Sequence, residues 1–129
     1  MNTNEFRVII SGAKEFDDYE LLKEKCDYYL SRKAADPTCK IIIMCGHEPG
    51  AEVLGERYAL EKKYELDLFI PNRGKNGKSA VFIRNKQMAK VANCAIIFKS
   101  AYGNNFPAEA LEKCVRWFHL LVRVVEEEA

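Results

Sequence analysis

The run Lys40-Ile-Ile-Ile-Met-Cys45 constrains the fold of this chain more than any other segment. Its apolar residues follow one another without polar alternation, which is typical of a strand covered on both faces. Similar apolar runs recur along the chain, separated by segments with helical character. These further predicted strands are Phe6–Ser11, Leu66–Ile70, Cys94–Phe98 and Leu120–Val125. Strands that alternate with helices form a parallel sheet with right-handed crossovers.

Four segments between or beside these strands carry the spacing or the capping residues of helices. The first begins after Asp17 or Asp18, either of which can cap it, and ends at Asp36-Pro37. The others run from about 50 to 64, from about 79 to 92, and onward from Pro107. Residues 73–78 are predicted as a loop, because glycine and asparagine favour turns. We therefore expect one domain, residues 1–129, built as a Rossmann-like three-layer α/β/α sandwich with a mainly parallel five-stranded sheet.

Composition excludes several classes of protein. No apolar run approaches the roughly 20 residues that span a bilayer, and the first residues lack the pattern of a secretion signal. We therefore expect a cytoplasmic protein that does not contact a membrane. The chain has five cysteines, an odd number, and no Cys-x-x-Cys, which indicates reduced thiols. Cys45 and His47 are too few ligands for a metal site, so neither a metal nor a resident cofactor is expected.

Charge is distributed unevenly along the chain. Between Leu68 and Ala108 there is no acidic residue, although the whole chain has a formal net charge of +1. The rest of the chain is therefore net acidic. The seven basic residues of this window are Arg73, Lys75, Lys78, Arg84, Lys86, Lys90 and Lys99. Such a window attracts anions, although it is equally typical of a solvated basic face.

Small residues follow the first two predicted strands, where a parallel sheet binds ligands. After the first strand, small residues let backbone N–H groups approach a ligand, and a lysine supplies charge. After the second, a glycine permits a tight turn, and a further glycine opens a helix whose N–H groups suit phosphate. The candidate ligand-binding residues of these two loops are Ser11, Gly12, Ala13, Lys14, Cys45, Gly46, His47, Gly50 and Ala51.

A second group of candidates lies in and after the basic window. The guanidinium of Arg84 suits phosphate or carboxylate, and the amide of Asn85 suits a ribose or a base. Lys78 adds positive charge next to them. Ser100 and Asn104 lie in the loop after the fourth predicted strand. Together these residues predict a site for a phosphate-bearing ligand at the carboxyl ends of the strands.

Glu52 is the one candidate catalytic residue. Its carboxylate lies in the first predicted turn of the second helix. There it can stabilise a positively charged reacting centre or activate water. An acidic residue in this position also complements the helix dipole without any catalytic role. The sequence leaves both interpretations open.

Three segments resemble the SLOG (SMF/DprA–LOG) superfamily, and in particular its small YspA-related branch. They are Ser11-Gly-Ala-Lys-Glu-Phe16, Gly46-His-Glu-Pro-Gly50-Ala51-Glu52, and Gly77-Lys78 with Ile83-Arg84-Asn85-Lys86-Gln87-Met88. The resemblance implies a Rossmann-like fold that binds nucleotides or nucleotide-derived ligands. The chain departs from the family pattern where His47 replaces a glycine, where Pro49 replaces an arginine, and where Lys14 replaces another arginine. These departures put catalysis in more doubt than binding.

Three functions follow from these residues and from the resemblance. The first is a module that binds a nucleotide or an NAD-derived small molecule, as a sensor or as a sequestering protein in phage–host conflict. The second is an N-glycosidic hydrolase of nucleoside monophosphates, with Glu52 as its catalytic carboxylate. The third is binding of single-stranded nucleic acid through the basic window, which the acidic balance elsewhere disfavours. We also expect a homo-oligomer, with the helix that carries Trp117 as the contact.

Overall fold

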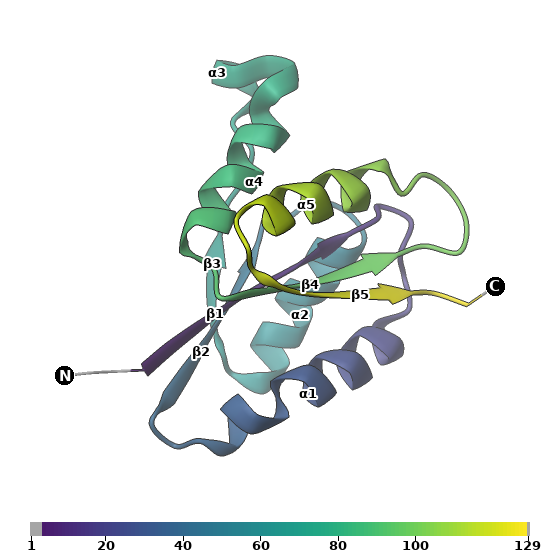
Figure 1. Cartoon of the computed structure of the whole chain (residues 1–129). Coiled ribbons are helices and arrows are strands. Elements are labelled where there is room, and N and C mark those ends of the chain that lie inside the picture. The colour runs from purple at the N-terminus through teal and green to yellow at the C-terminus, as the bar shows by residue number, and fades with distance from the viewer. Residues whose placement is uncertain (1–3, 129) are drawn as a thin grey trace.

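Five parallel strands form the single sheet of the computed structural model, which describes residues 4–128 (Figure 1). The strands are β1 (Asn4–Gly12), β2 (Cys39–Cys45), β3 (Glu65–Leu68), β4 (Cys94–Lys99) and β5 (Leu121–Glu126). Their order across the sheet is β3-β2-β1-β4-β5, with every neighbouring pair parallel. The predicted Rossmann-like α/β arrangement is thereby confirmed, and its sheet is parallel throughout.

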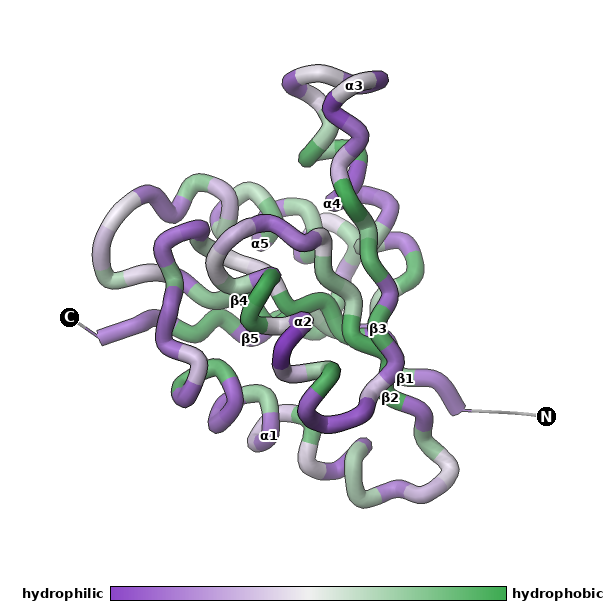
Figure 2. The backbone as a smooth tube through the Cα atoms, turned by 180° about the vertical axis from the view of Figure 1, so that it is seen from behind, coloured by the Kyte–Doolittle hydropathy of each residue, from purple (hydrophilic) through white to green (hydrophobic). Residues whose placement is uncertain are grey.

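Helices cover both faces of this sheet (Figure 1). The main helices are α1 (Tyr19–Ala35), α2 (Ala51–Lys62), α4 (Ala80–Val91) and α5 (Phe106–Trp117). Helices α1 and α2 pack with Val8 and Ile10 of β1 on one face, whereas α4 and α5 pack with Ile9 on the other. Strand residues that alternate between two buried faces explain the continuous apolar runs of the sequence. Figure 2 shows these apolar strands between the helical layers.

The predicted helix boundaries have local causes in the structure. The side chain of Asp18 accepts a hydrogen bond from the backbone N–H of Leu21 and caps α1, as predicted. At the other end of α1, Asp36 adopts an extended conformation ahead of Pro37. Pro107 lies in the first turn of α5, where no backbone N–H is needed.

The prediction of a loop over residues 73–78 is wrong. Residues Arg73–Asn76 form a short helix, α3, and Gly77–Ser79 form a 3-10 turn that leads into α4. The side chain of Asn72 accepts a hydrogen bond from the N–H of Lys75, and this cap starts the helix. The segment projects from the body of the molecule in both views (Figures 1 and 2).

Strand β3 also differs from its prediction, because it covers Glu65–Leu68 instead of Leu66–Ile70. Its regular pairing with β2 ends at the partners Cys45 and Leu68. Beyond that point, the carbonyl of Phe69 accepts a hydrogen bond from the guanidinium of Arg84. The polar network described below therefore takes the place of further strand pairing.

The strand order changes direction between β1 and β4. From β1 the chain moves outward through β2 to β3, and it then returns to place β4 on the other side of β1. In open parallel sheets, ligands bind beyond the carboxyl ends of the strands at such a reversal. Of the helices within residues 4–128, none is long and apolar enough to cross a lipid bilayer.

Candidate functional site

A cavity of about 220 Å³ lies at this reversal. Ser11 and Gly12, at the carboxyl end of β1, form one part of its lining, and the first turns of α5 after β4 form another. The remaining lining comes from the β2–α2 turn, from α3, and from α4 with the turn before it. Because α3 and α4 follow each other directly, the lining comes from four stretches of the chain: 11–14, 48–52, 73–85 and 106–111.

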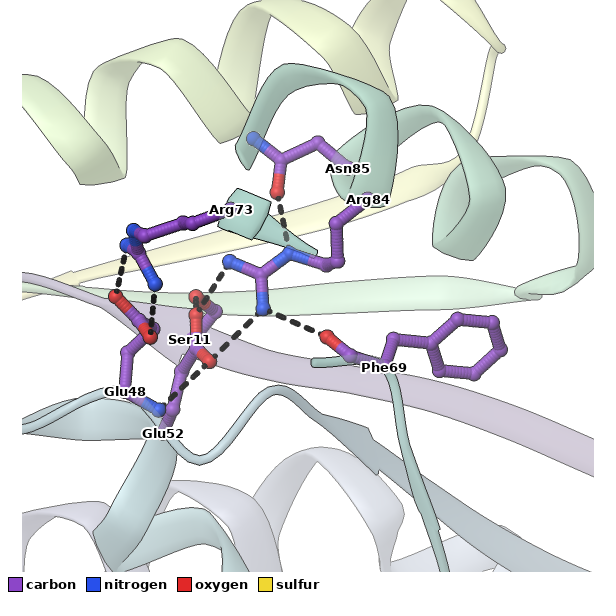
Figure 3. A network of polar contacts seen from close by, with 7 residues as sticks. All are labelled: Ser11, Glu48, Glu52, Phe69, Arg73, Arg84 and Asn85. Carbon is purple, nitrogen blue, oxygen red and sulfur yellow. Dashed lines mark hydrogen bonds and ion pairs between the residues drawn. The ribbon is translucent and has the colours of Figure 1, made fainter. Parts of the chain in front are cut away.

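A buried ion pair between Glu52 and Arg84 lies in the lining of the cavity (Figure 3). Each of the two residues is only 3% exposed. The guanidinium Nη1 donates to Glu52 Oε1 at 3.1 Å, and Nη2 donates to Oε2 at 3.0 Å. This two-bond geometry is the strongest arrangement between an arginine and a carboxylate. It joins the first turn of α2 to α4.

Both Glu52 and Arg84 form further hydrogen bonds. Ser11 Oγ donates to Glu52 Oε2 at 2.6 Å, and the backbone N–H of Glu48 donates to Oε1 at 3.3 Å. Arg84 Nε donates to Asn85 Oδ1 at 3.0 Å, and Nη1 also donates to the carbonyl of Phe69 at 3.1 Å. Because two buried charges are stable only when their hydrogen bonds are satisfied, this network explains why the pair can lie inside the protein.

Gly46 makes room for the guanidinium of Arg84. A Cβ atom at this position would overlap Arg84 Nη1 and would lie 2.6 Å from Glu52 Oε1 and 2.8 Å from the carbonyl of Phe69. Only glycine therefore allows the β2–α2 turn to lie against the ion pair. Gly46 was predicted to permit a tight turn and to line the ligand site, and the structure shows that it also makes room for an arginine.

Gly50 has a related role at the start of α2. Its φ angle is +88°, a region that other residues rarely adopt, and a Cβ there would overlap the backbone of Ala13 and Lys14. The N–H of Ala51 donates to the carbonyl of Ala13 at 3.2 Å. The N–H of Ala51, which was predicted to suit a phosphate, therefore already donates to the loop after β1.

A second ion pair, between Glu48 and Arg73, lies at the mouth of the cavity (Figure 3). Arg73 Nη2 donates to Glu48 Oε1 at 2.8 Å, and Nη1 donates to Oε2 at 3.3 Å. The hydrogen bonds from Arg73 hold the pKa of Glu48 below its ordinary value. The pKa of Arg73 is raised by the same contact. This pair connects the β2–α2 turn to α3.

Two lysines supply positive charge without a paired carboxylate. Lys14 and Lys78 line the cavity, and neither forms an ion pair with any of residues 4–128. The two arginines of the lining, in contrast, are matched by Glu48 and Glu52. The lining therefore carries an excess of positive charge, and the two lysines account for it.

Part of the cavity lining is apolar. Phe82 of α4 and Phe106 of α5 are largely exposed to solvent where they line the cavity, beside Val81, Pro107 and Leu111. None of these residues was a sequence candidate, because an apolar residue in a helix is ordinarily interpreted as core. The exposure of Phe82 and Phe106 in a lining that also carries charged groups marks them as candidate ligand contacts. Only the structure provides this information.

The structure brings seven of the sequence candidates to the cavity lining: Ser11, Gly12, Lys14, Glu52, Lys78, Arg84 and Asn85. Four more, namely Ala13, Gly46, Gly50 and Ala51, support the lining through the backbone contacts described above or lie against the ion pair. Glu48 and Arg73 also line the cavity but were not among the residues predicted from the sequence, although Arg73 belongs to the basic window.

Four candidates do not reach the cavity. Cys45 is buried in the core beneath α1 and α2, where burial raises its pKa well above the ordinary value. His47 is exposed and its Nδ1 atom contacts Glu56 at 2.9 Å. Ser100 Oγ accepts a hydrogen bond from the N–H of Tyr102, and Asn104 Oδ1 accepts one from Phe106. These polar groups stabilise their own loops.

Among residues 4–128, no three His, Cys, Asp or Glu side chains gather closely enough to hold a metal ion. The five cysteines are free thiols, and three of them are buried. Burial raises the pKa of Cys94 to about 12, which leaves its thiol protonated and unreactive at neutral pH. The polar side chains that line the cavity are two carboxylates, two arginines, two lysines, the hydroxyl of Ser11 and the amide of Asn85.

No curated protein matches the chain. A family model, in contrast, covers residues 6–75, from β1 to α3. This range contains Ser11, Gly46, Glu52 and Arg73 but ends before Arg84. The matched range exceeds half of the chain, and the chain belongs to the YspA, cpYpsA-related SLOG family.

Proposed function

We propose that this protein binds a nucleotide or an NAD-derived small molecule and does not cleave it. The observation that carries the proposal is the cavity at the strand-order reversal, whose lining combines unpaired lysines with exposed aromatic rings. A nucleotide has matching halves, because its phosphate is anionic and its base is flat and largely apolar. Family membership supports the same class of ligand.

The charged wall favours an anion. Lys14 and Lys78 bring two positive charges, and neither forms an ion pair with a carboxylate of residues 4–128. Both side chains are long and flexible, so they can adjust to a phosphate group at modest cost. We assign the phosphate of the ligand to this side of the cavity.

The aromatic wall suits a base. Phe82 and Phe106 lie on different helices and expose roughly half of their surface, 49% and 59% respectively. Stacking of a base on an aromatic ring contributes about 1–3 kcal/mol. Burying these rings against a ligand also removes apolar surface from water. We place the base between α4 and α5.

Asn85 supplies a further polar contact in the cavity lining. Its Oδ1 atom accepts the Nε–H of Arg84, which fixes the orientation of the amide because only oxygen can accept that bond. The amide nitrogen points away from the guanidinium (Figure 3) and is left to donate to a ligand. Asn85 is 2% exposed and lines the cavity, so this donor is held rigidly.

The surroundings of Glu52 favour binding over hydrolysis. Its two oxygens accept hydrogen bonds from Ser11, from the backbone of Glu48 and twice from Arg84. A carboxylate that activates water needs an acceptor position directed at that water. Because the acceptors of Glu52 are engaged by the protein, we assign it the role of positioning Arg84 and Ser11.

The test combines a binding and a turnover measurement on the purified protein. Calorimetric titration with AMP, CMP, NAD and ADP-ribose is expected to show micromolar or tighter binding of at least one compound, without release of base by chromatography. The variant Lys14→Ala/Lys78→Ala should weaken that binding, whereas Lys90→Ala, an exposed lysine of α4 outside the cavity, should not. Base release that disappears in Glu52→Gln would contradict the proposal in favour of the hydrolase.

A further inference from the structure

We propose that Arg73, and not Arg84, is the arginine that binds the anionic group of the ligand, and that Glu48 holds its guanidinium at the mouth of the cavity for this purpose. This inference rests on the proposed function, since it assigns a residue to the phosphate of the same ligand.

Arg84 has almost no N–H group left that could donate to a ligand. Of its five N–H groups, four donate to Glu52, Phe69 and Asn85. The residue is 3% exposed, and its charge is matched by a carboxylate that is equally buried. A ligand phosphate could claim Arg84 only by separating this pair, and an unpaired buried carboxylate is strongly unfavourable.

Arg73 has the opposite properties. Its side chain is 52% exposed, and it lines the same cavity. Within residues 4–128 its hydrogen bonds go to Glu48 alone, through Nη1 and Nη2, so three of its five N–H groups have no protein acceptor. A guanidinium held along one edge by a carboxylate can therefore receive a phosphate along another edge without breaking the first contact.

Glu48 is itself fixed in place, which makes Arg73 a preorganised donor. The N–H of Glu48 donates to Glu52 Oε1 at 3.3 Å, and its carbonyl accepts from the N–H of Val53 at 3.2 Å. The buried pair thus supports the turn that carries Glu48, and Glu48 supports Arg73. A side chain that is already ordered loses less entropy when the ligand binds.

The turn itself offers few donors, so a side chain from elsewhere is needed. Pro49 has no backbone N–H, and the N–H of Ala51 donates to Ala13. Arg73 reaches the same turn from α3, through its contact with Glu48 (Figure 3).

The charge of Glu48 should affect anion binding differently in two variants that lack Arg73. With Arg73 in place, the negative charge of Glu48 is matched. In Arg73→Ala the carboxylate stays at the mouth of the cavity without a partner and repels an incoming phosphate. The double variant Arg73→Ala/Glu48→Gln removes that repulsion as well. It should therefore bind an anionic ligand better than Arg73→Ala alone, although less well than the wild type.

The experiment compares AMP with adenosine, which lacks the phosphate, by calorimetric titration. We expect Arg73→Ala to bind AMP about tenfold to hundredfold more weakly than the wild type, as for loss of a charged hydrogen bond, with adenosine unchanged. Arg116→Ala is the matched control, because Arg116 is an exposed arginine of α5 that pairs with Glu112 away from the cavity. It should bind AMP like the wild type.

Three outcomes decide the matter. Selective loss of AMP binding in Arg73→Ala, with partial recovery in the double variant, supports the inference. AMP binding that is equal in the wild type and Arg73→Ala overturns the inference and leaves the proposed function standing. Failure of the wild type to bind AMP, ADP-ribose and inorganic pyrophosphate overturns both. Circular dichroism melting of each variant confirms that it is folded.

Discussion

At the scale of single residues, the buried pair depends on the absence of a side chain at position 46. Gly46 lies against Arg84, Glu52 and the carbonyl of Phe69 at once. Any Cβ atom there must displace the guanidinium or move the backbone of two segments. The requirement is steric, and it involves residues far apart in the sequence.

Gly46→Ala is therefore expected to lower the free energy of unfolding by about 3–5 kcal/mol, the usual cost of separating a buried ion pair. Urea denaturation measures the loss. Gly74→Ala is the matched control, because the nearest atom to its Cβ would be Asn72 Oδ1 at 3.7 Å. Equal stability of Gly46→Ala and the wild type would show that Arg84 does not depend on this glycine.

Glu52 and Arg84 are predicted to be strongly coupled. Glu52→Ala leaves the guanidinium of Arg84 buried without its carboxylate and should cost about 3–5 kcal/mol of unfolding free energy. Replacing both residues, as Glu52→Leu/Arg84→Met, should recover most of that stability, because apolar side chains of similar volume suit a buried position. Urea denaturation of Glu52→Leu, Arg84→Met and the double variant gives the coupling directly, and additive losses would contradict it.

The sequence identified Glu52 and Arg84 as chemically important but not as partners. Each belongs to a local pattern, Glu52 to a glycine turn and Arg84 to an Arg-Asn pair on a helix. Their contact spans 32 positions and depends on how α2 and α4 approach the end of the sheet from opposite faces. No local pattern encodes that approach, so the assignment of Arg84 to phosphate omitted the carboxylate that already binds it.

At the scale of elements, the Glu48–Arg73 pair connects the β2–α2 turn to α3. Arg73 lowers the pKa of Glu48 in the folded protein relative to its ordinary value of 4.5. The contribution of the pair to stability is thus complete above pH 4.5 and is lost as the pH falls through the lowered folded pKa. The pair is partly exposed, so its contribution is at most about 1 kcal/mol.

Glu48→Gln is therefore expected to unfold at slightly lower urea concentration than the wild type at pH 7, and this difference is expected to shrink as the pH falls below 4.5. The measurement is urea denaturation across this range at low ionic strength, where screening is weakest. Glu109→Gln of α5, an exposed carboxylate outside the cavity, is the control. A difference between Glu48→Gln and the wild type that grows toward low pH would contradict the assigned role.

The elements themselves were largely predictable, and the exceptions have physical reasons. Apolar runs predicted all five strands, and Asp18 and Pro107 gave the starts of two helices. Residues 73–78 were predicted as a loop because they contain two glycines. The prediction did not take into account the cap that Asn72 provides for α3. Strand β3 was misplaced because the carbonyl of Phe69 binds Arg84, a tertiary contact that alternation of residue types does not record.

At the scale of the whole molecule, folding cancels much of the charge separation seen along the chain. Arg73, Arg84 and Lys99 of the basic window pair with Glu48, Glu52 and Glu112, which lie outside it. Four lysines of the window are left, and only Lys78 lines the cavity. This arrangement favours a small anion in a cavity over a long nucleic-acid strand along a surface.

The predicted homo-oligomer is tested at Trp117. Its side chain is 80% exposed at the end of α5, where it lines a groove with Phe82 and Phe118. Burying such a ring between two copies removes a large apolar surface from water. Trp117→Glu is expected to shift a dimer toward monomer in sedimentation velocity, whereas Tyr28→Glu, at a position 73% exposed on α1, is not. A monomeric wild type would contradict this prediction.

We propose that the cavity between β1, α4 and α5 holds a phosphate-bearing nucleotide. Titration of ¹⁵N-labelled protein with ADP-ribose, followed by amide NMR shifts, tests it most directly. Saturable shifts concentrated at Lys14, Phe82, Asn85 and Phe106 are expected. Saturable shifts concentrated instead at the acidic groove between α1 and β5, around Asp18, Glu24 and Glu126, would contradict it, as would the absence of any shift.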